Sequence, residues 1–220
     1  MGRSLAVITS LHKKTQRDYI KRMNDNKVEC MEVARKYALG YWDGDRRYGY
    51  GGYKYDGRWN ALAEKLIKIY NLPKDARILD VGCGKGFLLF ELKKLLPDCE
   101  VAGFDLSRYA IESAKEEIKA NLFAHKAQDA YPFQNKEFDL VISITTLHNL
   151  YIYDLKLALQ EIERVGKNKY IVVESYRNVK ELFNLECWAL TCEAFFTPEE
   201  WVWLFNEFGY TGDYEFIYFE

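Results

Sequence analysis

The feature that most constrains the fold is an alternation of short apolar runs with longer amphipathic runs, which begins at Arg77. The apolar runs predict strands: RILDV (77–81), EVAGFDL (100–106), LFAHKA (122–127), FDLVISI (138–144), KYIVVESY (169–176) and YEFIYFE (214–220). Segments 86–96, 107–120, 153–165 and 197–209 have helical spacing, and Thr197 is a candidate N-cap of the last. Strands that alternate with helices form right-handed βαβ units. The sequence therefore predicts an α/β fold, a mainly parallel sheet with helices on both faces.

The first 59 residues do not continue this alternation. Residues 16–39 are predicted to form a charged amphipathic helix, and the Gly/Tyr-rich stretch DRRYGYGGYKYDGRW (45–59) follows. No linker separates this region from the rest. We therefore expect an extension over 1–59 that is attached to one compact domain over 60–220.

Composition limits the partners that this chain is expected to bind. Its 220 residues carry a formal net charge of −2, which provides no overall attraction to nucleic acid or anionic membranes. No apolar run reaches the length of about 18 residues that crosses a bilayer. Five cysteines and three histidines show neither a paired framework nor the spacing of a zinc site, so no metal is expected. The expected location is the reducing cytoplasm.

The segment LDVGCGKGF (79–87) carries most of the functional information. It places Asp80-x-Gly82-x-Gly84-x-Gly86 between a predicted strand and a predicted helix, where glycines permit a tight turn and close approach of a ligand. A dinucleotide fingerprint requires glycine where this chain has Phe87, and the Gly-Lys-Ser/Thr ending of a P-loop is missing. The loop resembles that of class I S-adenosylmethionine (SAM)-dependent methyltransferases. This resemblance covers residues 60–209 and implies their Rossmann-like fold.

Three further segments resemble the same family in their order and spacing. Asp105 ends the second strand, where the family places an acid that binds both ribose hydroxyls, and Asp129 in AQDAYPF (127–133) would contact the adenine amino group. Segment 138–150 resembles the strand and turn that form the floor of the cofactor pocket. Taken singly, each segment has a structural alternative: a capping Asp, a turn Asp or a core strand. The SAM site implied by the resemblance comprises Asp80, Gly82, Cys83, Gly84, Gly86, Asp105, Leu106, Gln128, Asp129 and Ile144.

One departure from the family concerns the end of the sheet. The family normally finishes with a sixth strand and an antiparallel seventh, whereas this chain has a single strand after segment 197–209. An unpaired sheet edge is prone to aggregation. We therefore expect SLAVITS (4–10) to supply an extra strand or to pack on the exposed edge, and a simply shorter sheet is the alternative.

The Gly/Tyr-rich stretch has three interpretations. Between Tyr41 and Trp59, four basic and three acidic side chains give a net charge of +1. This is too little to hold RNA by counterion release, although the rings could stack on bases. A packed surface loop is the second interpretation. In the family, the residues before the first helix often fold over the cofactor, which favours the third, a lid that binds the SAM carboxylate or an anionic substrate. The residues expected in this lid or at the substrate are Arg46, Arg47, Tyr48, Tyr50 and Tyr53.

The chemistry implied by the resemblance is an in-line displacement at a sulfonium, which depends mainly on alignment in a dry pocket. A base is needed only for a hydroxyl or a protonated amine acceptor. The candidate catalytic residues are His148, Glu174 and Tyr176, although His148 could serve turn geometry and Glu174 could form a salt bridge. Trp188, Phe195 and Phe196 could line an acceptor pocket or belong to the core.

These features predict a SAM-dependent methyltransferase that acts on a small, sugar-like or anionic acceptor. The alternatives are a SAM-binding enzyme with a different reaction, an RNA methyltransferase and a binding protein without turnover.

Overall fold

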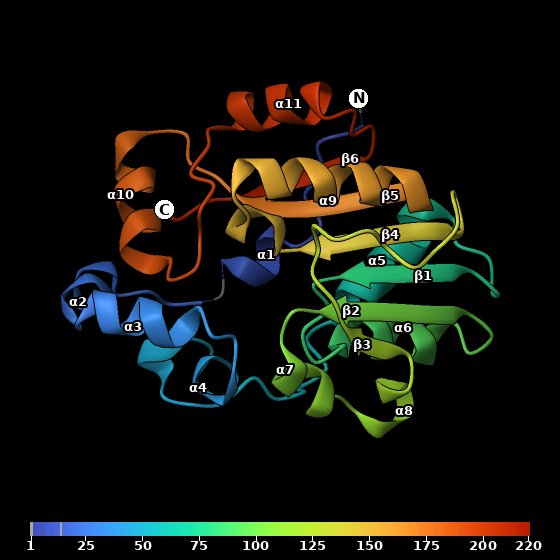
Figure 1. Ribbon diagram of the computed structural model, residues 1–220, viewed down its shortest axis with the longest axis horizontal. Coiled ribbons are helices and arrows are strands. Elements are labelled where there is room, and N and C mark those ends of the chain that lie inside the picture. The colour runs from blue at the N-terminus through green and yellow to red at the C-terminus, as the bar shows by residue number, and fades with distance from the viewer. Residues whose placement is uncertain (1, 14) are drawn as a thin grey trace.

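Six strands form one sheet in the order β3-β2-β1-β4-β5-β6, and each neighbouring pair is parallel (Figure 1). The structure is a computed structural model that describes residues 2–13 and 15–220. Met1 and Lys14, which belong to the predicted extension 1–59, lie outside the described residues. The strands are β1 Arg77–Val81, β2 Glu100–Asp105, β3 Leu122–Ala124, β4 Phe138–Ile144, β5 Gly166–Glu174 and β6 Asp213–Ile217. The predicted α/β fold is confirmed, and strand order reverses between β1 and β4, where sheets of this kind bind ligands.

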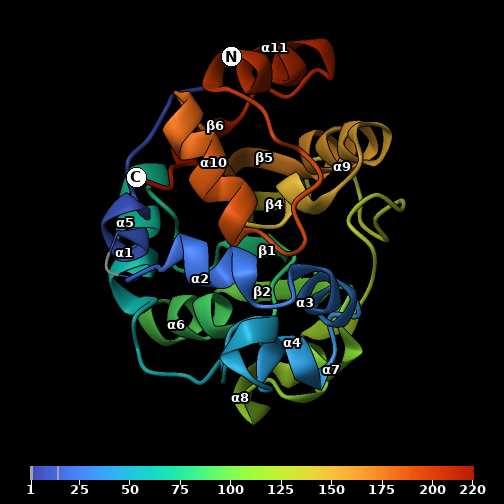
Figure 2. The same cartoon turned by 90° about the vertical axis from the view of Figure 1, so that its left-hand side faces the viewer.

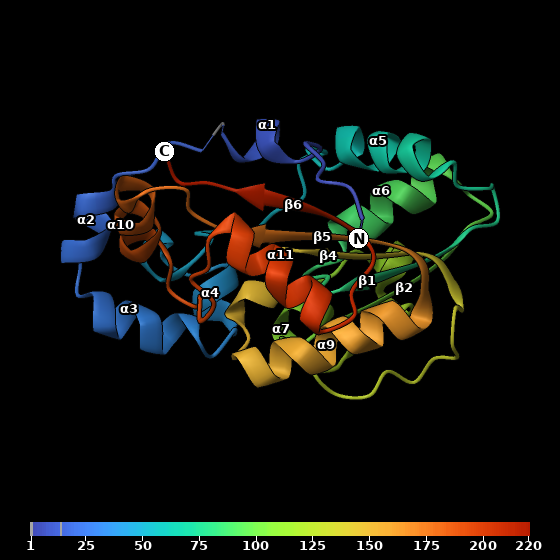
Figure 3. The ribbon, with the colours of Figure 1, turned by 90° about the horizontal axis from the view of Figure 1, so that it is seen from above.

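Helices cover both faces of the sheet (Figure 3). One face packs against α5 Asn60–Tyr70 and α6 Phe87–Leu95, and the other against α9 Ile152–Val165 and α11 Pro198–Glu207. Because both faces are covered, the central strands β1 and β4 are nearly continuous apolar runs. Each fully buried side chain of the size of Leu79 or Ile142 contributes about 1.5–3 kcal/mol to stability.

The predicted helix over 197–209 is confirmed as α11, and its start shows why. The Thr197 hydroxyl accepts a hydrogen bond from the Glu200 backbone N–H at 3.3 Å, and the Glu200 carboxylate accepts one from the Thr197 N–H at 2.7 Å. This reciprocal capping box satisfies two backbone donors that the first helical turn leaves unpaired.

Two of the predicted helices are not continuous, so these two predictions are wrong. Residues 16–39 form separate short helices, because Asn26 and Tyr37 adopt left-handed backbone conformations that interrupt the helical path. Residues 107–120 form α7 and α8, which are separated at Lys115, a residue with extended backbone. The remaining helices are α1 Thr9–His12, α2 Tyr19–Asn24, α3 Lys27–Ala34, α4 Leu39–Trp42, α7 Arg108–Glu112, α8 Glu116–Lys119 and α10 Val179–Trp188, with 3-10 turns at Arg46–Tyr48 and Leu147–Asn149.

The amino-terminal residues cover the edge of β6, as predicted for segment 4–10. Tyr214 in β6 exchanges backbone hydrogen bonds with Arg3 and Leu5 at 3.0 and 2.8 Å. The carboxylate of the adjacent Glu215 is buried and accepts hydrogen bonds from the backbone N–H groups of Val7 and Thr9 at 2.6 and 2.8 Å. The exposed edge is therefore closed by a short backbone pairing and a carboxylate, and no full seventh strand forms among the described residues.

The chain then crosses to the carboxyl ends of the strands. Helices α2, α3 and α4 lie there together with α10, at one end of the molecule (Figures 1 and 2). Across the described ranges, no helix combines the length and the apolar character needed to cross a membrane.

Candidate functional site

The loop between β1 and α6 turns at Gly82, Gly84 and Gly86, which have φ values of 79°, 55° and 68°. A Cβ atom on Gly82 would lie 2.1 Å from Thr146 Oγ1, and one on Gly84 would lie 2.8 Å from the Trp42 ring. Both positions therefore require glycine, because of the backbone conformation and because of the space. The turn exposes backbone at the point where strand order reverses.

Asp105, the last residue of β2, fixes this loop from the neighbouring strand. Its two carboxylate oxygens accept hydrogen bonds from the backbone N–H groups of Gly84 at 2.9 Å and Ser107 at 2.8 Å. Burial raises the pKa of Asp105, and the two amide donors act in the opposite direction. Each carboxylate oxygen can accept more than one hydrogen bond, so the group can also receive donors from a ligand.

Asp80 is a buried carboxyl that faces the same space. Among the described residues, no donor forms a hydrogen bond with its carboxylate. Burial, together with the nearby charge of Asp105, raises the pKa of Asp80 to about 8. A cation placed beside it would favour the ionised form. The ammonium group of SAM supplies such a cation, so the residues present fit this cofactor.

A cavity of about 800 Å³ lies over the carboxyl ends of β1, β2, β4 and β5. Most of the predicted site residues line it: Asp80, Gly82, Cys83, Gly84, Asp105, Leu106, Gln128, Ile144, His148, Glu174, Arg46, Tyr50 and Tyr53. The other predicted residues lie outside its lining: Gly86, Asp129, Tyr176, Arg47 and Tyr48. Leu106 is 52% exposed, which leaves an apolar side chain free to pack on a ring.

Four aromatic side chains from residues 41–53 cover the glycine loop: Tyr41, Trp42, Tyr50 and Tyr53. We call these four side chains the aromatic roof. Trp42 stacks on Tyr50 with centroids 5.2 Å apart, and its Nε1 donates a hydrogen bond to Ser107 Oγ at 2.9 Å. This contact joins α4 to the start of α7, which lies beside it (Figure 2). The stretch is therefore an ordered part of the cavity wall.

Asp43 attaches the aromatic roof to the glycine loop. Its carboxylate accepts hydrogen bonds from Lys85 Nζ at 2.6 Å, from Tyr109 Oη at 2.7 Å and from the Tyr53 backbone N–H at 3.0 Å. Burial acts to raise the pKa of Asp43, but Lys85 and Tyr109 hold it below its usual range. Lys85 is itself buried, so this ion pair is shielded from solvent.

The predicted lid arginines separate in the structure. Arg46 lines the cavity, whereas Arg47 forms ion pairs with Asp25 at 2.9 Å and Glu29 at 3.8 Å. Tyr48 also bonds Glu29, at 2.7 Å, and thereby braces the 3-10 turn against α3. Arg47 and Tyr48 hold the segment in place, and Arg46 is the member that faces the cavity.

His148 and Glu174 lie together at the ends of β4 and β5. The Glu174 backbone N–H donates to His148 Nδ1 at 3.1 Å, so the neutral ring carries its proton on Nε2. That nitrogen lies 3.5 Å from Glu174 Oε2. Burial lowers the pKa of His148 to about 3 and raises that of Glu174 to about 7. Glu174 is thus the member of the pair with free acceptor capacity and a pKa near neutrality.

Several lining residues were not predicted from sequence: Arg17, Arg22, Tyr41, Trp42 and Thr146. Arg17 and Arg22 lie in the charged region taken for one long helix, where surface arginines are ordinary. Trp188, which sequence indicated as a candidate pocket residue, does line the cavity, whereas Phe195 and Phe196 do not. A tryptophan amid glycines and tyrosines was the available signal for Trp42.

A parallel sheet of this order, with a glycine loop after β1 and an acid at the end of β2, is a Rossmann-like nucleotide-binding fold, and the family match below identifies its class as that of SAM-dependent methyltransferases. The chain belongs to the methyltransferase domain family, whose sequence model matches residues 72–209. The fold agrees with this assignment. The YcgJ protein from Bacillus subtilis superposes with a TM-score of 0.53 at 21% identity, over 66% of each chain.

Curated relatives of the chain carry different functions. Mouse mitochondrial arginine-hydroxylase NDUFAF5 is 28% identical over 121 residues, 54% of this chain and 34% of the relative. Ribosomal RNA small subunit methyltransferase C of Buchnera aphidicola is 35% identical over 85 residues, which are 38% of this chain and 24% of the relative. Malonyl-acyl carrier protein O-methyltransferase of Legionella pneumophila is 36% identical over 110 residues, which are 48% of this chain and 37% of the relative. The matches span less than two fifths of each relative.

Proposed function

We propose that this protein transfers a methyl group from SAM to a hydroxyl or amine of a small-molecule acceptor. One observation carries the proposal: the residues that fit SAM and the pair His148–Glu174 line the same cavity, which the aromatic roof covers. A volume of about 800 Å³ is within the range of small-molecule sites. Residues 1–59 then serve as a wall of the acceptor site on the domain over 60–220.

The roles of the residues follow from their positions. SAM, when bound, supplies a methyl group on a positively charged sulfur, and the carbon–sulfur bond breaks with its electron pair on sulfur. Asp80 holds the ammonium group, Asp105 accepts hydrogen bonds from the ribose, and Leu106 packs on the adenine. Glu174 accepts the proton that the acceptor oxygen or nitrogen loses, and His148 holds Glu174 through the contacts at its backbone and carboxylate. The aromatic roof excludes water.

The acceptor class is tested with methyl-labelled SAM and a fractionated cell extract. Label in the low-molecular-weight fraction supports the proposal. Label in RNA supports an RNA methyltransferase, and SAM consumption without labelled product supports a different reaction at the same site. SAM binding without any turnover in any fraction supports a binding protein. A cytoplasmic location is a further proposal, which rests on the cysteine pattern.

The proton acceptor is tested with Glu174→Gln. We expect the rate of methyl transfer in the wild type to rise with pH through about 7, because the Glu174 carboxyl must lose its proton first. Glu174→Gln keeps the shape but accepts no proton, so the rate falls by about 100-fold and loses this pH dependence. Glu186→Gln, on the exposed side of α10, is the control. A retained pH profile in Glu174→Gln would exclude Glu174 as the base.

A further inference from the structure

Three arginines gather around Trp188 in the cavity. The guanidinium carbons of Arg17, Arg22 and Arg46 lie 5.4, 5.1 and 5.2 Å from the Trp188 ring centroid. All four residues line the cavity. They come from the segment before α2, from the last turn of α2, from the 3-10 turn and from the end of α10. Segments distant in the sequence therefore bring three positive charges to one place.

No described carboxylate lies within ion-pair distance of these charges; Glu174 interacts electrostatically with Arg17, and Asp25 with Arg22, at longer range. Within residues 2–13 and 15–220, no Asp or Glu forms an ion pair with Arg17, Arg22 or Arg46, whereas Arg47 is paired with two acids. The Nε atoms of Arg17 and Arg22 are buried, and neither has a hydrogen-bond partner in the described chain; the Nε of Arg47, outside the cavity, is in the same state. Such groups require an explanation, and of the three only Arg17 and Arg22 line the cavity. A bound anion would satisfy both donors and the charge.

Backbone carbonyls hold Arg22 and Arg46 in place, and Arg17 also contacts His12, whose Nδ1 lies 3.2 Å from Arg17 Nη2. Arg22 Nη1 donates to the carbonyl oxygens of Arg46 and Arg47, each at 2.9 Å, and Arg46 donates to that of Gly49. Arg17 Nη1 donates to the carbonyl of Thr15 at 3.0 Å. The fork geometry of a guanidinium group suits phosphate oxygens. The cluster is therefore preorganised before a ligand arrives.

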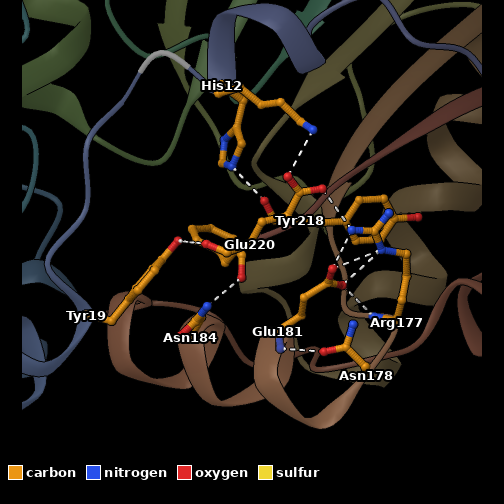
Figure 4. A network of polar contacts seen from close by, with 10 residues as sticks. His12, Tyr19, Arg177, Asn178, Glu181, Asn184, Tyr218 and Glu220 are labelled. Carbon is orange, nitrogen blue, oxygen red and sulfur yellow. Dashed lines mark hydrogen bonds and ion pairs between the residues drawn. The ribbon is translucent and has the colours of Figure 1, made fainter.

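The scaffold around the cluster is equally well fixed (Figure 4). The carboxyl-terminal residues lie between α1 and α10: His12 contacts the Tyr218 carbonyl at 3.2 Å, and Asn184 donates to the Phe219 carbonyl at 2.9 Å. Glu220 pairs with Arg177 at 2.9 Å. Arg17 also lies 5.1 Å from the Phe219 ring. This network fixes α10, which carries Trp188, and the segment that carries Arg17.

We propose that Arg17, Arg22 and Arg46 around Trp188 bind a phosphate group of the acceptor, which is therefore a phosphorylated small molecule. Three unpaired guanidinium groups suit a dianionic phosphate better than a single carboxylate. This assignment rests on the proposed function, because it takes the Trp188 side of the cavity as the acceptor side. The cluster lies within a covered cavity of a chain with net charge −2, which favours a small ligand over RNA.

The test uses inorganic phosphate as the probe, titrated by calorimetry into the full chain saturated with SAM. The variants are Arg17→Gln, Arg22→Gln and Arg46→Gln, and Arg108→Gln, at an exposed arginine outside the cavity, is the matched control. We expect each cavity variant to weaken phosphate binding about tenfold or more, since a charge-assisted hydrogen bond contributes about 1.5–3 kcal/mol. Arg108→Gln is expected to leave phosphate binding unchanged, and acetate should bind more weakly than phosphate.

SAM affinity, measured on the same samples, shows that each variant is folded and separates the two proposals. Unchanged phosphate binding in the cavity variants, acetate binding as tight as phosphate, or displacement of phosphate by a short single-stranded RNA would overturn the phosphate assignment. Loss of SAM binding in Arg46→Gln with phosphate binding intact would assign the cluster to the SAM carboxylate instead. Failure of the wild type to bind SAM would refute the proposed function and not the anion site.

Discussion

Replacing Asp80 with Asn should stabilise the ligand-free protein while removing most of its affinity for SAM. The Asp80 carboxyl is buried, and its pKa is raised to about 8 in the folded state, against about 3.9 in an unfolded chain. The unfolded chain therefore loses this proton near pH 4, but the folded protein keeps it until about pH 8. Folding is penalised across that interval, by about 4 kcal/mol at pH 7. An asparagine of similar size avoids the penalty.

The assay is urea unfolding of the ligand-free wild type and Asp80→Asn between pH 4 and pH 9. We expect the two free energies of unfolding to be similar near pH 4. The variant should become progressively more stable as the pH rises, and the difference should level off above about pH 8, where the folded carboxyl also ionises. Asp98→Asn, which removes the same charge from an exposed loop, is the control.

SAM binding should reverse the order of the two proteins. An ammonium group beside Asp80 favours the ionised carboxylate, so binding at pH 7 should release close to one proton from the wild type and none from the variant. Loss of a buried charge pair costs about 3–5 kcal/mol, which predicts SAM binding at least about 100-fold weaker in Asp80→Asn. Calorimetry in buffers of different ionisation enthalpy measures both quantities. A less stable variant, or equal SAM affinity without proton release, would refute this reasoning.

Two further substitutions test the loop and the aromatic roof. Asp105→Asn replaces one of the two oxygens that accept the Gly84 and Ser107 N–H groups with a donor. It should weaken SAM binding about 100-fold and lower the free energy of unfolding by about 1–3 kcal/mol; calorimetry and urea unfolding report these changes, and unchanged SAM affinity would remove Asp105 from the site. Asp43→Asn leaves Lys85 buried without its ion pair, so we expect a loss of about 3 kcal/mol. Faster proteolysis between residues 41 and 59 should accompany it, and an unaltered cleavage rate would mean that other contacts hold the roof.

The sheet and the residues around the glycine loop could be predicted from sequence because both depend on local patterns. The apolar runs indicate the strands, and the spacing Asp80-x-Gly82-x-Gly84 indicates a turn at the end of a strand. Asp105 could be predicted because it is the last residue of the next strand. These residues are neighbours in space because parallel strands bring their carboxyl ends to one edge of the sheet.

The rest of the cavity wall could not be predicted in the same way. The distances that assemble it join residues far apart in sequence, such as Arg17 to Trp188 and Trp42 to Ser107. No periodicity in the sequence indicates such contacts, and the pattern of a charged segment is typical of an ordinary surface helix. The breaks at Asn26 and Tyr37 redirect that segment, and of the two only asparagine is a residue type commonly found in the left-handed conformation.

The family model leaves out the segment that precedes residue 72, and this has a consequence for how proteins of this kind are grouped. The family model covers residues 72–209, and Arg17, Arg22, Arg46 and the aromatic roof all precede it. A comparison confined to the shared core groups such proteins by that core, and its matches include a hydroxylase as well as methyltransferases. Proteins that modify unrelated compounds can therefore score alike, and the preceding segment is where their preferences would diverge.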